Sequence, residues 1–345
     1  MKLLSVILLA IVNFCLIRAS PGGRVFNGDF IYDIYSANSN ECSIYGLDSG
    51  LKNAKEIVIP EFFTDKNGKK YYVVQIEYGA FSNSKLEKVT FNPSSKTVKL
   101  DYFSFYNNKN LRKVIFNHGN FEISDNAFNS CKDVDFDGSG VPAIVERMAK
   151  ALLEKWNLPI GYTGYEKAGL TARNKKMADL YKLAKKIKEN FDYYHWNNAG
   201  FNLPAVFIFR SGSSRGINMA YRELAKHMGV DEKRFLCVAD GITASWNYVI
   251  LNFDKRANTW FNVDPYYYDF SKNDSPSAFF MTDKQFVNHL VNNVNPALPY
   301  ENKSRPDRWW VYTARYGTEN EGELYTHMLI DNYIKQNNLG GRREN

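Results

Sequence analysis

The chain has 345 residues and a formal net charge of +7, with 44% hydrophobic and 23% charged residues. This balance excludes a wholly disordered chain, and the length predicts about two domains. The 44 Lys and Arg residues are spread along the chain instead of forming a basic stripe, so no nucleic-acid partner is expected. Aromatic residues reach 15%, which predicts cores dominated by Phe and Tyr.

The first residues have the pattern of a targeting segment. Lys2 precedes an almost wholly apolar run over residues 3–17, which a polar residue and Ala19 follow. About 15 apolar residues are too few for a spanning helix but suit a secretory signal peptide. We therefore predict a signal peptide over residues 1–19, a secreted, extracellular product and no membrane span after cleavage. An uncleaved anchor is the alternative.

Cysteines and sequons are both compatible with secretion. Cys42, Cys131 and Cys237 follow the predicted signal peptide, and three cysteines are too few for a disulfide scaffold, so one pair or none is expected. Asn273 and Asn302 each begin an Asn-x-Ser sequon, which predicts glycosylation at both positions. The five histidines are scattered and no zinc-binding spacing occurs, so neither a metal nor a cofactor is expected.

A motif recurs three times between residues 75 and 136. Each copy has a Phe at the end of a turn-like segment and another at the end of a Leu-x-x-Val-x-Phe run or a variant of it, namely Phe81, Phe105 and Phe128, then Phe91, Phe116 and Phe136. These spacings of 20 to 25 residues fall within the range of leucine-rich repeats. A short strand with alternating apolar residues buries its face only by stacking on its neighbours.

These copies, with the strand-like segments 30–34, 57–60 and 69–76 before them, resemble the BspA-type leucine-rich repeats of secreted and surface proteins. The resemblance covers about residues 22–140. It implies a short β-rich solenoid over residues 20–140, with the earlier segments as its cap and first strands. An ordinary antiparallel β-domain with accidental spacing is the alternative.

The turn-rich segment 137–142 predicts a domain boundary, with a second domain over residues 141–335 and a polar tail over 336–345. Apolar residues at helical spacing predict helices over about 143–156 and 174–191. A glycine-led loop precedes a further predicted helix that Gly229 stops. Predicted strands follow at residues 235–238, 244–251 and 260–265, and then a helix toward Val291.

Residues 170–295 resemble the transglutaminase-like (papain-like) domain. Trp246-Asn247 and Val263-Asp264-Pro265 stand where that family has its His-Ala-Trp-Asn strand and its Val-Asp-Pro-Thr turn. The resemblance implies a nucleophile at a helix N-terminus, a base at the start of a strand and an orienting carboxylate on the next strand. The predicted fold class is α+β: a leucine-rich-repeat solenoid plus a transglutaminase-like domain.

The resemblance places Ser214 at the nucleophile position, Ala244 at the base and Asp264 at the orienting carboxylate. A second register would place Asn218 at the nucleophile instead of Ser214. The chemistry needs a thiolate and an imidazole, and neither is present. We therefore expect no catalytic residues, with Asp264 as an acceptor for backbone N–H groups. The remaining cleft would bind a ligand through Ser214, Trp246, Asn247, Asp264 and Tyr266.

The sequence therefore predicts a secreted binding or adhesion protein whose inactive transglutaminase-like domain takes part in recognising a protein or glycan. The alternative is an active peptidase or acyl transferase with an atypical nucleophile, which would require an imidazole close to Ser214. A third hypothesis is a structural or adhesive surface component that acts through residues 20–140 alone.

Overall fold

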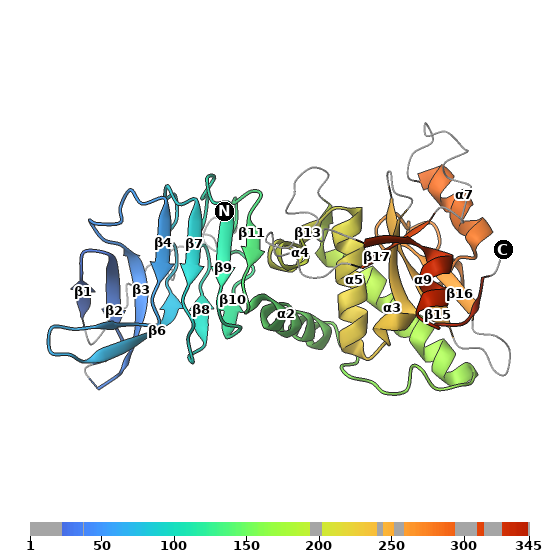
Figure 1. Cartoon of the computed structure of the whole chain (residues 1–345), viewed down its shortest axis with the longest axis horizontal. Coiled ribbons are helices and arrows are strands. Elements are labelled where there is room, and N and C mark those ends of the chain that lie inside the picture. Colours follow the sequence, from blue (N-terminus) through green and yellow to red (C-terminus); the bar gives the residue numbers. More distant parts are fainter. Residues whose placement is uncertain are drawn as a thin grey trace, which may run out of the picture.

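The computed structural model describes residues 23–36, 38–193, 202–239, 244–251, 259–293, 309–313 and 326–343. The predicted signal peptide and the sequon at Asn302 lie outside these residues. A β-rich repeat part, residues 23–140, leads into a second part of helices and strands, residues 141–343 (Figure 1). The predicted mixed α+β class is confirmed. Among the described residues, no helix combines the length and the apolar character needed to cross a bilayer.

Two sheets of short strands form the repeat part, and successive repeats give one strand to each. The first sheet has the order β1-β2-β3-β6-β8-β10 with β5 paired to β6, and the second has the order β11-β9-β7-β4. The strands of the first sheet are β1 (Arg24–Phe26), β2 (Phe30–Ile34), β3 (Glu41–Leu47), β5 (Phe62–Thr64), β6 (Lys70–Ile76), β8 (Val98–Leu100) and β10 (Phe121–Ile123). Those of the second sheet are β4 (Glu56–Ile59), β7 (Lys88–Phe91), β9 (Lys113–Phe116) and β11 (Asp135–Asp137).

The predicted repeat strands are the parallel strands β7, β9 and β11. Their Phe side chains stack from one repeat to the next, with ring centroids 5.3 Å apart for Phe91 and Phe116. The Phe residues of the turns do the same, at 4.8 Å for Phe105 and Phe128. Each repeat thus covers the apolar face of its neighbour, as the period predicted.

The segment between β11 and α2 (Val141–Lys155) turns sharply. Gly138 has φ +107°, and a Cβ on it would lie 2.4 Å from the carbonyl oxygen of Phe116, so only glycine fits this turn. The following helix α2 leads from the repeat part to α5 (Ser214–Met228) (Figure 1). One continuous apolar core runs through both parts.

A six-stranded sheet with the order β18-β17-β14-β15-β16-β19 is the centre of the second part. It is antiparallel from β18 to β16, and β19 is parallel to β16. The strands are β14 (Phe235–Ala239), β15 (Ser245–Leu251), β16 (Thr259–Val263), β17 (Trp310–Thr313), β18 (Thr326–Leu329) and β19 (Arg342–Arg343). Part of the predicted polar tail is therefore a strand of this sheet.

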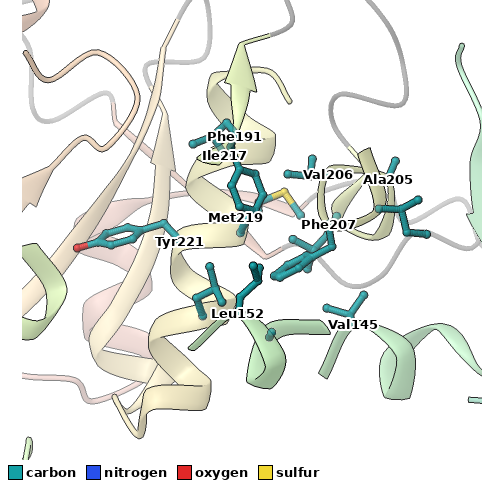
Figure 2. Packing of buried hydrophobic residues seen from close by; sticks show 14 of the residues in the cluster. Val145, Leu152, Phe191, Ala205, Val206, Phe207, Ile217, Met219 and Tyr221 are labelled. Carbon is teal, nitrogen blue, oxygen red and sulfur yellow. The ribbon is translucent and has the colours of Figure 1, made fainter. Parts of the chain in front are cut away.

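Helix α5 packs on β14 and β15, and its neighbouring helices are α2, α3 (Leu170–Asn190) and α4 (Leu203–Phe209). Of the other helices, α6 (Pro276–Phe279) packs on α3, α7 (Asp283–Asn293) on β16, and α9 (Ile330–Gln336) on β17 and β18. Figure 2 shows Ile217 and Met219 of α5 facing Phe207 of α4 and Leu152 of α2. Helices α2, α3, α5 and α7 and strands β14 to β16 lie where the sequence predicts them, whereas α4 was not predicted.

One lysine of α3 is buried, although lysines ordinarily face solvent. Lys176 is fully buried, and its Nζ lies 2.8 Å from Glu166 Oε1 and 3.1 Å from the carbonyl oxygen of Ile250. Burial lowers the pKa of Lys176, while the neighbouring Glu166 carboxylate opposes that shift. The lysine therefore joins α3 to β15 instead of facing water.

Candidate functional site

Helix α5 begins where the sequence predicts a nucleophile position. The Ser213 side chain caps the helix by accepting a hydrogen bond from the Gly216 N–H at 3.2 Å. Gly229 ends it in the left-handed region at φ +107°, where a Cβ would lie 2.3 Å from the carbonyl oxygen of Tyr162. This fixed beginning and end place Ser214 in the first turn of α5.

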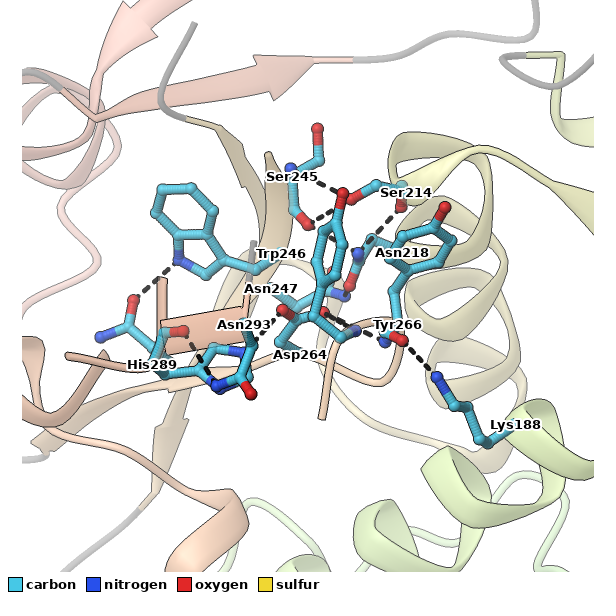
Figure 3. A network of polar contacts seen from close by, with 12 residues as sticks. Lys188, Ser214, Asn218, Ser245, Trp246, Asn247, Asp264, Tyr266, His289 and Asn293 are labelled. Carbon is cyan, nitrogen blue, oxygen red and sulfur yellow. Dashed lines mark hydrogen bonds and ion pairs between the residues drawn. The ribbon is translucent and has the colours of Figure 1, made fainter. Parts of the chain in front are cut away.

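The Ser214 hydroxyl connects this helix to the start of β15. Its Oγ accepts from Ser245 N–H at 3.2 Å and donates to the Ser245 carbonyl oxygen at 2.9 Å. Asn218 Nδ2 also donates to that carbonyl, at 2.8 Å, and Asn218 Oδ1 accepts from Asn247 Nδ2 at 2.6 Å (Figure 3). Ser214 and Asn218, the two candidates for the nucleophile position, thus both contact Ser245 at the start of β15, just after Ala244.

Asp264 lies at the end of β16 and is fully buried. Its Oδ1 accepts hydrogen bonds from the backbone N–H groups of Tyr266 and Tyr267, at 3.0 and 3.1 Å. Its Oδ2 lies 3.0 Å from His289 Nε2, on helix α7. The predicted role as a backbone acceptor is seen, and the imidazole partner comes from α7 and not from position 244.

His289 completes this buried pair. Its Nδ1 lies 3.1 Å from Asn293 Nδ2, and its Nε2 faces Asp264 Oδ2. Figure 3 shows the His289 ring and the Ser214 side chain on opposite sides of Asp264. His289 is therefore engaged in the structure of the domain and is not directed at Ser214. No motif in the sequence connects positions 264 and 289, which meet only through the packing of α7.

The other predicted binding residues are also buried. Trp246 Nε1 donates to Asn262 Oδ1 at 2.8 Å, and its ring packs 4.7 Å from that of Phe286. Asn247 is fully buried, Tyr266 is 5% exposed, and the Tyr266 carbonyl accepts from Lys188 Nζ. All three side chains are thus buried within the second part, and their contact with a ligand stays a prediction.

A buried thiol, that of Cys237, contacts this network. Cys237 Sγ on β14 lies 3.5 Å from Asn247 Oδ1, and burial raises the pKa of the thiol to about 11. It therefore stays protonated at neutral pH, as expected of a structural cysteine. Cys42, Cys131 and Cys237 form no disulfide. In the part of the chain that the structure describes, no three His, Cys, Asp or Glu side chains are grouped to hold a metal ion.

Comparisons with known proteins identify the repeat part. Residues 52–139 match the BspA type leucine-rich repeat region in six copies. A leucine-rich repeat protein of solved structure from Bacteroides capillosus is similar over 33% of this chain and 96% of its own, with 18% identity and a TM-score of 0.25. No curated protein matches the chain significantly. The family match confirms the predicted BspA-type repeat region over residues 52–139. It ends before α2, so the transglutaminase-like interpretation of the second part stays a prediction.

Proposed function

We propose that this chain is a secreted or surface binding protein of adhesion type, whose second part is a transglutaminase-like domain without catalytic activity. The leucine-rich repeat region suggests a protein-binding or adhesion role, and BspA-type repeats are typical of extracellular or surface proteins. The observation that carries the second half of the proposal is the contact between Ser214 and Ser245, beside Ala244.

This contact supports a former acyl-transfer site. A helix N-terminus meets the first residue of β15, and Asp264 follows the neighbouring strand β16, which is the arrangement that the resemblance implies. The thiolate and the imidazole that such chemistry uses are replaced by Ser214 and Ala244. A serine hydroxyl needs an adjacent base, but the described partners of Ser214 Oγ are backbone groups of Ser245.

Asp264 supports the same conclusion from the other side of the site. In an active site its carboxylate would orient the base, whereas here its partners are His289 and two backbone N–H groups. A carboxylate used in this way stabilises the turn after β16 and contributes nothing to activating Ser214.

Amine incorporation and peptide hydrolysis by the purified chain test this proposal, with the Ser214→Ala variant measured beside it. We expect no turnover above the blank in either protein, because no base activates the hydroxyl. Turnover that disappears in Ser214→Ala would overturn the proposal and favour an active enzyme with an atypical nucleophile.

A further inference from the structure

Two stacked turns of the repeat part carry exposed aromatic side chains, and a third turn stacks on the second. The turns are joined by hydrogen bonds of 2.9 Å, from Asn83 N–H to the Tyr106 carbonyl and from Asn107 N–H to the Asn129 carbonyl. Tyr78 and Tyr102 occupy matching positions in the first two turns and are 57% and 49% exposed. With Phe103 and Tyr106 they form what we call the aromatic row: Tyr78, Tyr102, Phe103 and Tyr106.

Phe103 has an unfavourable backbone conformation within this row. Its φ is +58°, at a position where the preceding turn has Gly79 with φ +66°. The left-handed region is costly for a bulky side chain. The Phe103 ring meets Tyr78 and Tyr106 edge to face, with centroids 5.7 and 5.4 Å apart. The chain thus has an aromatic side chain at a position where glycine would be unstrained. Strained backbone positions of this kind cluster at functional sites.

A cleft of about 730 Å³ begins at the third turn of the same stack. Asn126, Asn129 and Ser130 line it from the turn, and Asp192 and Ser211 line it from the second part. A hydrogen bond of 3.2 Å from Phe103 N–H to the Asn126 carbonyl joins the second turn directly to the third. The aromatic row and the cleft therefore lie on consecutive turns, and a ligand of several units can contact both.

The charges around the cleft balance one another. Its lining includes three carboxylates, of Asp125, Asp133 and Asp192, and the ammonium groups of Lys109 and Lys132. A third cation is close by, because Arg210 lies 3.5 Å from Asp125. The cleft consequently attracts neither a strongly acidic nor a strongly basic ligand. Phe128, Ile208 and Phe209 add apolar surface to the polar part of the lining, so the cleft suits a ligand with both polar and apolar faces.

We infer that the aromatic row and this cleft bind a neutral oligosaccharide. Sugar hydroxyls both donate and accept, and so do the amides of Asn126 and Asn129, while the carboxylates accept from paired hydroxyls. The C–H face of a sugar ring packs on an exposed aromatic ring, which offers a broad apolar surface with a polar rim. The inference rests on the binding role proposed above and names the class of ligand.

A glycan array that carries neutral, sialylated and sulfated glycans tests this inference on the whole chain. We expect binding to neutral glycans that is insensitive to added salt, because no net charge takes part. The Tyr78→Ala/Tyr102→Ala variant should lose at least about tenfold in apparent affinity, since both exposed rings provide packing surface. Asn129→Asp, which removes two N–H donors and keeps the side-chain shape, should also weaken binding. Tyr45→Ala, at a 42% exposed tyrosine on β3, is the matched control and should bind normally.

A silent array, binding confined to acidic glycans, or full binding by the Tyr78→Ala/Tyr102→Ala variant would each overturn the inference. These outcomes leave the proposed lack of catalysis in place, because that proposal depends on turnover at Ser214. Turnover that depends on Ser214 would overturn the proposed function and leave a neutral-glycan signal on the array unaffected, so the two failures are distinguishable.

Discussion

At the scale of single residues, the carboxylate of Asp264 has three hydrogen-bonding partners. It is fully buried and interacts with His289 and with the N–H groups of Tyr266 and Tyr267. Removing a buried acceptor leaves its donors without partners, which costs more than the hydrogen bonds themselves contribute. The side chain is therefore expected to matter for stability.

We predict that Asp264→Ala lowers the free energy of unfolding by about 3 kcal/mol, because two backbone donors and His289 lose their acceptor. Urea denaturation followed by circular dichroism measures this change. Glu122→Ala, at an exposed carboxylate on β10, is the control and should unfold at an unchanged midpoint. An Asp264→Ala variant as stable as the parent would show that the buried pair has no structural role.

Because of its buried thiols, the chain is expected to lose stability as the pH rises into the alkaline range. Burial raises the pKa of Cys42 to about 12 and that of Cys237 to about 11. An unfolded thiol loses its proton near pH 8.5, so between that pH and the folded pKa the unfolded chain binds fewer protons. The free energy of unfolding should therefore fall as pH rises above about 8.5, by at most about 1.4 kcal/mol per pH unit for each thiol.

Urea midpoints between pH 8 and 10.5 test this expectation, with Cys42→Ala as the comparison. That variant should have a flatter pH dependence than the parent, whatever its stability at pH 8. An identical slope in both proteins would assign the alkaline loss to other groups. The same thiols should react slowly with alkylating reagents in the native chain and rapidly in urea, because the thiolate is the reactive form.

At the scale of elements, one asparagine joins two turns of the repeat part. Asn108 is fully buried and donates to the carbonyls of Phe81 and Phe105 at 2.8 and 2.9 Å. Its Oδ1 accepts from the Ser84 N–H and hydroxyl, at 2.8 and 2.6 Å. All hydrogen-bonding capacity of the amide is used, so no other side chain of similar size replaces it.

Asn108→Ala should destabilise the chain by about 3 kcal/mol, because it leaves four polar groups without this partner between stacked turns. The midpoint of urea unfolding is the readout. Asn110→Ala, two residues later and exposed, is the matched control and should have little effect. Equal midpoints for the two variants would contradict the role assigned to Asn108.

The repeat strands can be predicted from the sequence, whereas the pairing of Asp264 with His289 and the burial of Lys176 cannot. Each repeat strand packs its apolar residues against the next repeat along the chain. The regular spacing of Phe91, Phe116 and Phe136 therefore indicates which residues contact one another. The pairing of Asp264 with His289 depends on how α7 packs, and no local pattern encodes it. Lys176 is similar, because its burial follows from Glu166 and the Ile250 carbonyl, which come from elsewhere in the chain.

At the scale of the whole molecule, contacts at the junction connect the repeat part to the second part. Asn202 Nδ2 donates to Asp135 Oδ1 at 2.7 Å, and the rings of Phe136 and Phe209 lie 5.6 Å apart. These contacts and the continuous apolar core favour unfolding of both parts together.

All six tryptophans lie after residue 141, so their fluorescence reports on the second part alone. We predict that the urea midpoint measured by tryptophan fluorescence coincides with that of far-UV circular dichroism, to which both parts contribute. Two separate transitions would mean that the junction contacts are too weak to couple the parts.

The rate of thiol alkylation in the Ser214→Cys/Ala244→His double variant tests the proposed former active site most directly. An imidazole beside a thiol at a helix N-terminus lowers the pKa of the thiol and makes it reactive below its usual range. At about pH 6 the introduced thiol of the double variant should react with iodoacetamide at least about tenfold faster than that of Ser214→Cys alone. Equal rates in the two variants would mean that positions 214 and 244 do not face each other as an acyl-transfer pair, and would contradict the transglutaminase-like interpretation.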